Sequence, residues 1–400
     1  MKKLFFLLLA GSMLFSCTND DIQTQTEDLQ VKTGVTSEII PGKYIVVYNA
    51  EGIKKAARIA AQSGKQVIAP ENINKLTEQI LLDADITLRT PEQTYSSALK
   101  GVAIELTENE ADKLALSSSV KGVYPDMMVN FGLPEVTIKA KPAPQPVAQS
   151  TPWGITRIGG STDGTGKTAW IIDTGIDMDH PDLTVDQTRG KNFVTTSALP
   201  DDDNGHGTHC AGIVAAKNNN LGVVGVAAGA TLVPIKVLNR RGSGAYSAIM
   251  AGVDYVATNG KAGDAVNMSL GGPAYLPLDQ AIQALAEKGI KVALAAGNES
   301  QDANNVSPAR VNGADIYTIS AMKKNDIFDS TYSNYGNPPV DYCAPGTAIY
   351  STYKGGGYAT LSGTSMAAPH VCGLLLLGNI STSGTVKNDP DGNADPIAHR

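Results

Sequence analysis

The sequence of 400 residues has no excess of positive charge, little cysteine and no long apolar run in its body. Lysine and arginine number 32 against 39 aspartate and glutamate, so the formal net charge is -7 and no basic surface for nucleic acid is expected. After the first residues no apolar stretch reaches the roughly 18 residues that a membrane-spanning helix needs. There is no internal repeat. With 42% hydrophobic and 18% charged residues, the chain can build a large core and a second domain.

Three short motifs contain the groups that turn a hydroxyl into a nucleophile. Ser365 lies in Gly363–Pro369 (GTSMAAP), His206 lies in Asn204–His209 (NGHGTH), and Asp173 ends an apolar run. Activating a serine takes an imidazole that accepts its proton and a carboxylate that orients the imidazole and stabilises its cation. Alone, such an aspartate is usually a turn residue, and a glycine-rich stretch around a histidine is usually a loop. The three together favour a serine protease.

The order of the three residues separates the families that use them. Asp, then His, then Ser is the subtilisin order, whereas an α/β-hydrolase needs Gly-x-Ser-x-Gly and residue 367 is alanine. From about Ala148 to about Gly373 the chain resembles the subtilisin family of serine proteases, with features of proteinase K and thermitase. A weaker resemblance covers the region before it. The fold implied is α/β, with a doubly wound parallel sheet in the catalytic domain.

The resemblance also implies catalytic roles. Ser365 attacks the peptide carbonyl, His206 moves the proton and Asp173 orients His206. The side-chain amide of Asn298, after the apolar run Val292–Ala296, donates to the oxyanion together with the Ser365 N–H. Without the other three residues, Asn298 has an equally good interpretation as a plain turn residue.

Local patterns agree with these roles. Lys167–Ile172 is predicted to be a buried strand, and open α/β sheets place their sites at the carboxyl ends of strands, where Asp173 stands. His206 opens an apolar helical segment, and Ser365 begins a helix whose first N–H groups are unpaired. Pro369 has no N–H to donate to the Ser365 carbonyl, which predicts an irregular first turn.

Two glycine-containing segments resemble those between which the family holds an extended peptide as an added strand: Gly242–Tyr246 (GSGAY) and Ser269–Gly272 (SLGG). Main-chain pairing reads no side chains, so broad specificity is expected. Either segment alone is more commonly an ordinary loop. The candidate substrate-binding residues are Gly242, Gly244, Tyr246, Ser269, Leu270, Gly271 and Gly297.

Lys217–Val223 (KNNNLGV) resembles the tight calcium loop of the family. Ca²⁺ takes six to eight oxygen ligands, and a loop rich in asparagine and glycine can supply several. The structural Ca²⁺ ligands implied are the carbonyls of Lys217, Leu221 and Val223 and the side chains of Gln149, Asp182 and Asn219. An unliganded asparagine-rich turn is the alternative. A second, weaker cation site at Asp341 is left open.

The N-terminus has the pattern of an export signal. Met1-Lys2-Lys3 precedes an apolar stretch that ends in LFSC, which resembles a bacterial lipobox and predicts acylation at Cys17. An ordinary signal peptide with a stray cysteine is the alternative. We expect a lipoprotein signal peptide at 1–17 and a polar tether at 18–38.

If Cys17 carries lipid, three cysteines remain, which allow at most one disulfide: Cys210, Cys343 and Cys372. Cys210 stands four residues after His206, so a helix places both on one face. The resemblance here is to a thiol-containing subgroup, in which such a cysteine lies beneath the catalytic histidine and does no chemistry.

Residues 39–131 resemble the family's inhibitory propeptide, a small α+β (split βαβ) domain that assists folding and blocks the active site until it is cleaved. We expect a strand at Lys43–Tyr48, a helix from Glu51, a strand at Gly101–Leu106, and a helix capped by Thr107 and Glu110. A proline-rich linker, expected to be extended, follows at 132–147, and the catalytic domain at 148–400.

Two points in this assignment stay open. Cleavage before Ala148 suits the calcium site, whereas cleavage after Phe131 suits an apolar specificity pocket. After Ser381 the chain is polar and rich in Gly, Asp and Pro, so the closing helices of the family are expected to be short or missing.

The sequence therefore predicts an exported serine endopeptidase made as a self-processing zymogen. Its expected partners are protein or peptide substrates, its own propeptide as inhibitor, and the membrane before maturation; a monomer is expected. The catalytic domain is predicted to be released from a lipoprotein of the cell envelope into the periplasm or the medium. A catalytically inactive peptide-binding module is the alternative, and peptide ligation on the same triad cannot be separated by sequence.

Overall fold

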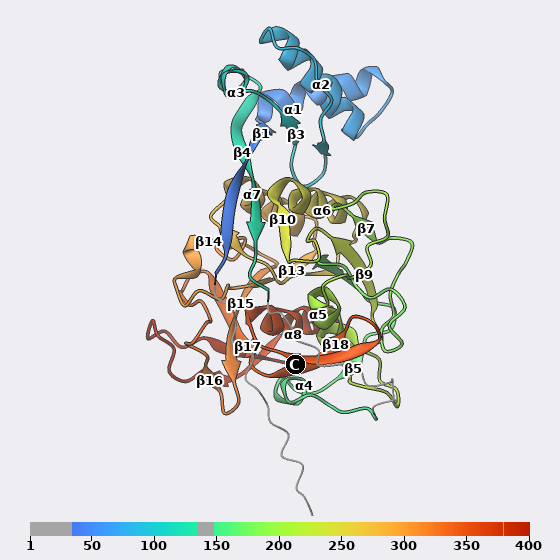
Figure 1. Ribbon diagram of the computed structural model, residues 1–400, viewed down its shortest axis with the longest axis vertical. Helices are drawn as coiled ribbons and strands as arrows, with labels where there is room; N and C mark the ends of the chain where they lie inside the picture. Colours follow the sequence, from blue (N-terminus) through green and yellow to red (C-terminus); the bar gives the residue numbers. More distant parts are fainter. Residues whose placement is uncertain (1–33, 134–147, 379) are drawn as a thin grey trace, which may run out of the picture.

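A computed structural model describes residues 34–133, 148–378 and 380–400. They form a small first unit (34–133) that lies on a larger second unit (148–378 and 380–400), as Figure 1 shows. The predicted signal peptide with Cys17, most of the predicted tether and nearly all of the predicted linker lie outside the described residues. Within the described ranges no helix combines the length and the apolar character needed to cross a bilayer.

The first unit is an antiparallel sheet with three helices on one face. Its elements are β1 (Thr36–Tyr48), α1 (Ala50–Gln62), α2 (Pro70–Asp83), β2 (Gln93–Tyr95), β3 (Gly101–Glu105), α3 (Glu108–Ala115) and β4 (Val120–Asn130). Successive side chains of β1 point to opposite faces of the sheet. Val46 and Tyr48 pack in a cluster with helix residues such as Leu76, whereas Ile45 and Val47 belong to a cluster shared with the second unit.

The predicted capping box at the start of α3 is confirmed. The Glu110 N–H donates to Thr107 Oγ1 at 3.3 Å, and the Thr107 N–H donates to Glu110 Oε2 at 2.8 Å. Both groups would otherwise be unpaired donors at the helix start.

Two boundaries of the first unit differ from the prediction. β1 begins at Thr36, inside the predicted tether, because its first residues pair with the end of β4. At the other end the predicted extended linker does not start at once. Gly132 has a left-handed φ of 55°, and Leu133 is buried against Gly242.

The second unit is built on a mostly parallel sheet in the order β20-β21-β17-β15-β13-β11-β6-β9-β7, which confirms the predicted fold class. The strands of this sheet are β6 (Thr168–Asp173), β7 (Lys191–Asn192), β9 (Thr231–Lys236), β11 (Ala265–Met268), β13 (Lys291–Ala295), β15 (Ile316–Lys323), β17 (Val340–Pro345), β20 (Ser381–Thr385) and β21 (Pro396–His399). The helices are α4 (Trp153–Arg157), α5 (His206–Ala215), α6 (Tyr246–Asn259), α7 (Leu276–Ala286), η1 (Ala303–Asn305) and α8 (Thr364–Leu377). The short strands are β5 (Thr162–Asp163), β8 (Ala227–Ala228), β10 (Ser243–Ala245), β12 (Gly272–Pro273), β14 (Val306–Ser307), β16 (Ile327–Phe328), β18 (Ile349–Tyr353) and β19 (Gly357–Leu361).

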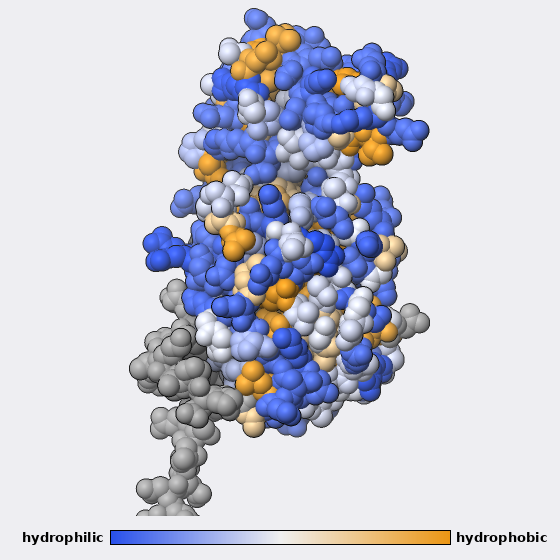
Figure 2. Space-filling model, turned by 90° about the vertical axis from the view of Figure 1, so that its right-hand side faces the viewer, coloured by the Kyte–Doolittle hydropathy of each residue, from blue (hydrophilic) through white to orange (hydrophobic). Residues whose placement is uncertain are grey.

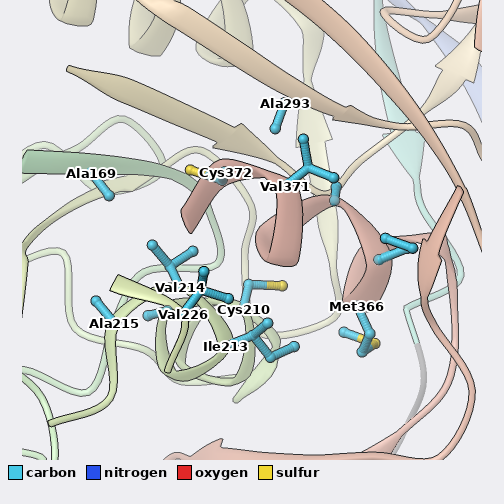
Figure 3. Close-up of a cluster of buried hydrophobic side chains, with 14 of the residues drawn as sticks. Ala169, Cys210, Ile213, Val214, Ala215, Val226, Ala293, Met366, Val371 and Cys372 are labelled. Atoms are coloured by element: carbon cyan, nitrogen blue, oxygen red, sulfur yellow. The ribbon is translucent and has the colours of Figure 1, made fainter. Parts of the chain in front are cut away.

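Helices cover both faces of this sheet, which is why its strands are almost continuously apolar. Along β6, Ala169 and Ile171 face a cluster with α5 and α8, whereas Trp170 and Ile172 face a cluster with α6 and α7. Figure 3 shows the first cluster, in which labelled side chains of α5 lie near those of α8. The two helices that carry His206 and Ser365 therefore share one packed layer.

The C-terminal region ends in strands. After α8 the described residues contain no further helix, and β21 adds to the sheet parallel to β17, with Cys343 opposite Ile397. Ile397 and Val386 are buried with Phe328 and Met322, so the polar tail still contributes to a core cluster. The closing helices of the family were expected to be short or missing, and in the described residues the antiparallel strands β20 and β21 follow α8.

The two units share a large apolar contact. Ile45, Val47 and Tyr95 of the first unit belong to the same buried cluster as residues of α6 and α7. Hydrogen bonds also cross this contact. The Asp254 carboxylate on α6 accepts the backbone N–H groups of Ser96 and Ser97 at 3.0 and 2.7 Å. On the face drawn in Figure 2, hydrophilic residues predominate and hydrophobic ones form small separate patches.

We predict that Leu76→Ala destabilises the first unit by about 2–5 kcal/mol, because Leu76 is fully buried and truncation leaves a cavity. Leu116→Ala is the control, since Leu116 is 87% exposed and its loss should change stability by at most about 0.5 kcal/mol. Hydrogen exchange of β3 amides in the full chain measures both. Equal protection in the two variants would contradict this packing.

Candidate active site

Asp173 is placed by the central strand β6. It is the last residue of that strand, between β9 and β11, and is completely buried. His206 Nδ1 lies 2.8 Å from Oδ1 and 3.0 Å from Oδ2 of Asp173. A carboxylate only accepts hydrogen bonds, so Nδ1 carries the proton and Nε2 is the free base.

His206 is the first residue of α5, and two glycines bring it to Asp173. Gly205, before the helix, has a left-handed φ of 112°. A Cβ on Gly207 would lie 2.1 Å from the Gly175 carbonyl oxygen, so only glycine allows the first turn of α5 to approach the end of β6.

Asp202 fixes the loop before His206, a role that the sequence motifs did not suggest. The carboxylate is almost fully buried and accepts the backbone N–H groups of Asn204 and Gly205 at 2.9 and 2.8 Å. It also accepts from the hydroxyls of Thr174 and Thr208. Its position four residues before the histidine, ahead of Asn and Gly, is the signal that could have revealed it.

The pKa of His206 reflects two opposed effects. Burial lowers it, but the adjacent Asp173 carboxylate stabilises the imidazolium and holds the pKa well above the ordinary 6.5. Burial raises the pKa of the Cys210 thiol, so the thiol stays neutral. The Asp173 carboxylate is therefore the group that stabilises a positive charge on His206. Burial lowers the pKa of the other histidine of the motif, His209, to about 3, and its Nε2 lies 3.0 Å from the Ile349 carbonyl.

Ser365 is the second residue of α8, and its hydroxyl makes no hydrogen bond with His206 in the described residues. Oγ donates to the Ser269 carbonyl at 3.3 Å, and the buried Nε2 of His206 has no hydrogen-bond partner among the described residues. In the described part of the chain the structure therefore shows the aspartate–histidine contact but not a serine–histidine hydrogen bond.

The structure shows how the irregularity predicted at Pro369 is accommodated. Pro369 lies inside α8 and cannot donate to the Ser365 carbonyl, which accepts two side-chain donors in its place. Ser269 Oγ donates at 2.8 Å and Cys210 Sγ donates at 3.4 Å. Cys210 Sγ also lies 4.0 Å from His206 Nδ1, so the thiol packs beneath the histidine and holds the serine backbone.

Asn298 stands beside the serine with its orientation fixed. Its Oδ1 accepts the N–H of Thr364 at 2.8 Å and the Thr364 hydroxyl at 3.0 Å. The Nδ2 group is therefore the one left to face the cavity that Asn298 and Ser365 line together.

That cavity is small, with a volume of about 10 Å³ for the centre of a water-sized sphere, and is lined by residues of both units. From the second unit it is lined by several of the predicted substrate-binding residues and by the catalytic candidates: Ser269, Leu270, Gly271, Ala295, Gly297, Asn298, Glu299, Thr364 and Ser365. From the first unit Val35, Phe131 and Leu133 line it. Asp173, His206 and Ser365 are all almost fully buried in the full chain.

Of the two predicted substrate segments, one pairs with the first unit. β10 is antiparallel to β4, with Gly244 opposite Val129, and the Phe131 N–H donates to the Gly242 carbonyl at 3.1 Å. The other segment, Ser269–Gly272, forms no strand pairing with β4 in the described residues, in which β1 pairs with the other edge of β4. The placement of a substrate strand between the two catalytic segments stays a prediction.

Tyr246, predicted as a pocket wall, is fully buried at the start of α6. Its ring stacks on Tyr275 at 4.2 Å between centroids, and its hydroxyl donates to the Pro273 carbonyl at 2.7 Å. It connects the segment after β10 to β12.

The predicted calcium ligands lie together. Gln149 Oε1 accepts the Asn219 N–H, and Asp182 accepts Asn219 Nδ2 at 2.9 Å and the Val223 N–H at 3.1 Å. The Lys217 N–H donates to the Asp182 carbonyl, and Leu221 forms a β-bridge with Ala148. Asp182 is completely buried, and none of the ion pairs within the described ranges includes it.

A second group of possible metal ligands is the catalytic one. Asp173, His206 and Cys210 are the one set of three His, Cys, Asp or Glu side chains in the described residues whose ligand atoms all lie within 4.8 Å. We assign this set to the proton relay, because Nδ1 already carries a proton for Asp173.

Comparison with known proteins agrees with this geometry. The model of the subtilase family matches residues 164–378, and the model of peptidase inhibitor I9 matches residues 43–131. The extracellular serine proteinase of Thermus sp. (strain Rt41A) is 34% identical over 387 residues, which cover 93% of this chain and 88% of the relative. The alkaline serine protease ver112 of Corniculantispora psalliotae is 36% identical, with 78% and 80% covered.

Solved structures give the same result. The crystal structure of a cold-adapted subtilisin-like serine proteinase matches with a TM-score of 0.56 at 36% identity, covering 62% of this chain and 97% of that one. The catalytic unit of this chain thus has nearly the whole of that structure as its counterpart.

We predict that His206 titrates above pH 6.5 and that Asp173→Asn moves its pKa below 6.5, because the burial remains and the carboxylate charge is lost. NMR titration of the imidazoles, in a full chain carrying Ser365→Ala to keep it intact, measures this. His180, whose pKa is lowered by burial, serves as the internal control and should not change. A His206 pKa unaffected by Asp173→Asn would contradict the pairing.

Proposed function

Since the chain belongs to the subtilase family of serine proteases, we propose that Asp173, His206 and Ser365 are the residues with which it hydrolyses peptide bonds. The observation that carries this assignment is the buried contact of Asp173 with His206 Nδ1 at 2.8 Å, beside a serine at the start of α8. It leaves Nε2 free on the side where a proton acceptor is needed.

The reaction follows from these positions. Ser365 Oγ rotates from the Ser269 carbonyl to His206 Nε2 and attacks the peptide carbon, while Nε2 takes its proton. Asp173 stabilises the imidazolium, which then protonates the leaving amine. Asn298 Nδ2 and the Ser365 N–H hold the developing oxyanion. A water molecule activated by His206 completes the hydrolysis of the acyl-enzyme.

The chain is made as a zymogen with its inhibitor in the same polypeptide. The end of the propeptide occupies a strand position beside β10, where we infer that a substrate strand binds. Pairing through backbone groups supports broad specificity, with pocket walls from Leu270 and Ala295–Gly297. We propose that self-processing occurs between Phe131 and Ala148.

Two hydrogen bonds of the residues that follow Ala148 support a mature chain that begins near this residue. The N–H groups of Gln149 and Ser150 donate to the carbonyls of Asn220 and Gly222, which ties this segment to the catalytic unit. The inactive peptide-binding alternative has no supporting observation, because every group of the triad is present and the relatives are named proteinases.

We also propose that Gln149, Asp182, Lys217, Asn219, Leu221 and Val223 hold a structural Ca²⁺. The fit rests on chemistry: the loop offers backbone carbonyls and the Asn219 side chain, and the Gln149 and Asp182 side chains beside it add oxygen ligands. The buried Asp182 carboxylate also lacks a cationic partner among the described residues. When bound, the ion would neutralise that carboxylate and tie the segment after Ala148 to the loop. It takes no part in the chemical step.

Two observations support the proposal that the chain is exported. The relatives include an extracellular serine proteinase and an alkaline serine exoprotease A of Vibrio alginolyticus, and the chain begins with a charged and then apolar segment. The LFSC sequence supports acylation at Cys17. The anchor would then remain with the propeptide when the catalytic unit is released.

Ser365→Ala should abolish hydrolysis, by at least about 10⁴-fold, because the nucleophile is gone while the fold remains. The wild-type chain should be recovered as a soluble fragment starting near Ala148, and the variant as a full-length protein in the membrane fraction. Casein hydrolysis and fractionation measure both. Cys17→Ala separates the two proposals, since it should be active but never membrane-bound; an intact wild-type protein in the membrane would refute release.

Removal of Ca²⁺ should lower the melting temperature of the intact Ser365→Ala chain by about 5–10 °C, since the ion binds only the folded state. Asp182→Asn should lower it similarly and make it insensitive to chelator. Glu287→Gln, an exposed change just after the end of α7, is the control and should keep the chelator response. Calorimetry with elemental analysis provides the test, and a melting temperature independent of chelator with no bound metal would remove the assignment.

A further inference from the structure

Strand β1 extends beyond the recognised inhibitor domain. The match to the inhibitor model begins at residue 43, whereas β1 begins at Thr36. We call Val35–Ile39 the N-terminal arm. Its residues 36–39 pair antiparallel with residues 127–130 of β4, in register from Thr36 opposite Asn130 to Ile39 opposite Met127. In Figure 1 the two long strands descend side by side from the first unit onto the second.

The arm has one face toward the protein. Val35 and Ser37 are half-buried, Thr36 and Glu38 are exposed, and Ile39 is 61% exposed. From Val35 to Glu38 this alternation is that of a strand lying on a surface, whereas Ile39, which the alternation would place on the inward side, is exposed. The inward residue Val35 lines the cavity of Ser365 and packs against the apolar cluster that includes Leu270.

The arm changes what β4 can pair with. β4 lies between β10 on one edge and β1 on the other, so both of its edges are occupied. The segment Ser269–Gly272, which borders the cavity on the catalytic side, makes no strand pairing with β4 in the described residues. β1 also lies against β12, which continues that segment. The arm therefore flanks β4 at the cleft, where Val35 lines the cavity together with Leu270 and Gly271, while β4 itself reaches Gly272 through Val129.

We propose that the N-terminal arm is a second inhibitory segment, which fills the Ser269–Pro273 side of the substrate cleft and must leave before a substrate strand can pair there. The proposal rests on the protease function above and adds to the inhibition by β4. Two consequences distinguish an inhibitory arm from a strand that is merely longer. The arm must be docked at the cleft, and its release must control when activity begins.

The first experiment uses full-length chains refolded from denaturant, with hydrolysis of a fluorogenic peptide followed over time. Val35→Asp places a charge at the cavity wall and should shorten the delay before activity at least about threefold, since a charge at a partly buried apolar contact is costly. Ile39→Asp, at a position of the same arm that is 61% exposed, should match the wild type. The final rates should be equal, because the arm is lost with the propeptide.

The second experiment covers variants that fold poorly. In intact Ser365→Ala chains, hydrogen exchange should show protected amides in residues 36–39, and Val35→Asp should remove that protection while residues 45–48 keep theirs. Equal delays for Val35→Asp and Ile39→Asp, or an unprotected arm in the parent chain, would overturn this inference alone. No hydrolysis by any refolded chain would overturn the proposed function, and this inference with it.

Discussion

The carboxylate of Asp173 is completely buried, and the imidazole of His206 is the one group with which it forms an ion pair among the described residues. Breaking a buried pair by removing one partner typically costs about 3–5 kcal/mol, because the remaining charge is uncompensated. The neighbouring structure keeps the pair at contact distance. β6 places the carboxylate at the carboxyl end of the sheet, Gly207 lets α5 approach it, and Asp202 holds the loop before the helix.

A second constraint comes from Pro369. A proline inside a helix frees the carbonyl four residues earlier, and here that carbonyl belongs to Ser365, the proposed nucleophile. Ser269 and Cys210 donate to it from a loop and from α5. The backbone carbonyl of Ser365 is therefore held by two side-chain donors, whereas its hydroxyl makes one hydrogen bond, to the Ser269 carbonyl.

The sequence allowed prediction of the parallel sheet, the capping box of α3 and the residues that meet around the cleft, because short motifs and apolar runs have local causes. It did not reveal β4, whose burial alternates only in part and whose partners lie far away in the chain, nor α2, which was not identified in the region between the predicted strands. The arm was assigned to a polar tether because Thr36, Ser37 and Glu38 carry no apolar signal. Their strand conformation depends on pairing with residues 128–130, which only the tertiary structure supplies.

The pairing of β4 with β10 also has a consequence for how activity spreads through a population of molecules. While a peptide bond joins the two units, the inhibitor is held at an effective concentration of the order of millimolar. Once that bond is cut, occupancy depends on the bulk concentration and on how fast the freed inhibitor is degraded. The first uninhibited molecule can digest the inhibitors of its neighbours, so activation becomes autocatalytic. A crowded envelope and a dilute secretion should then differ in timing even though every molecule has the same structure.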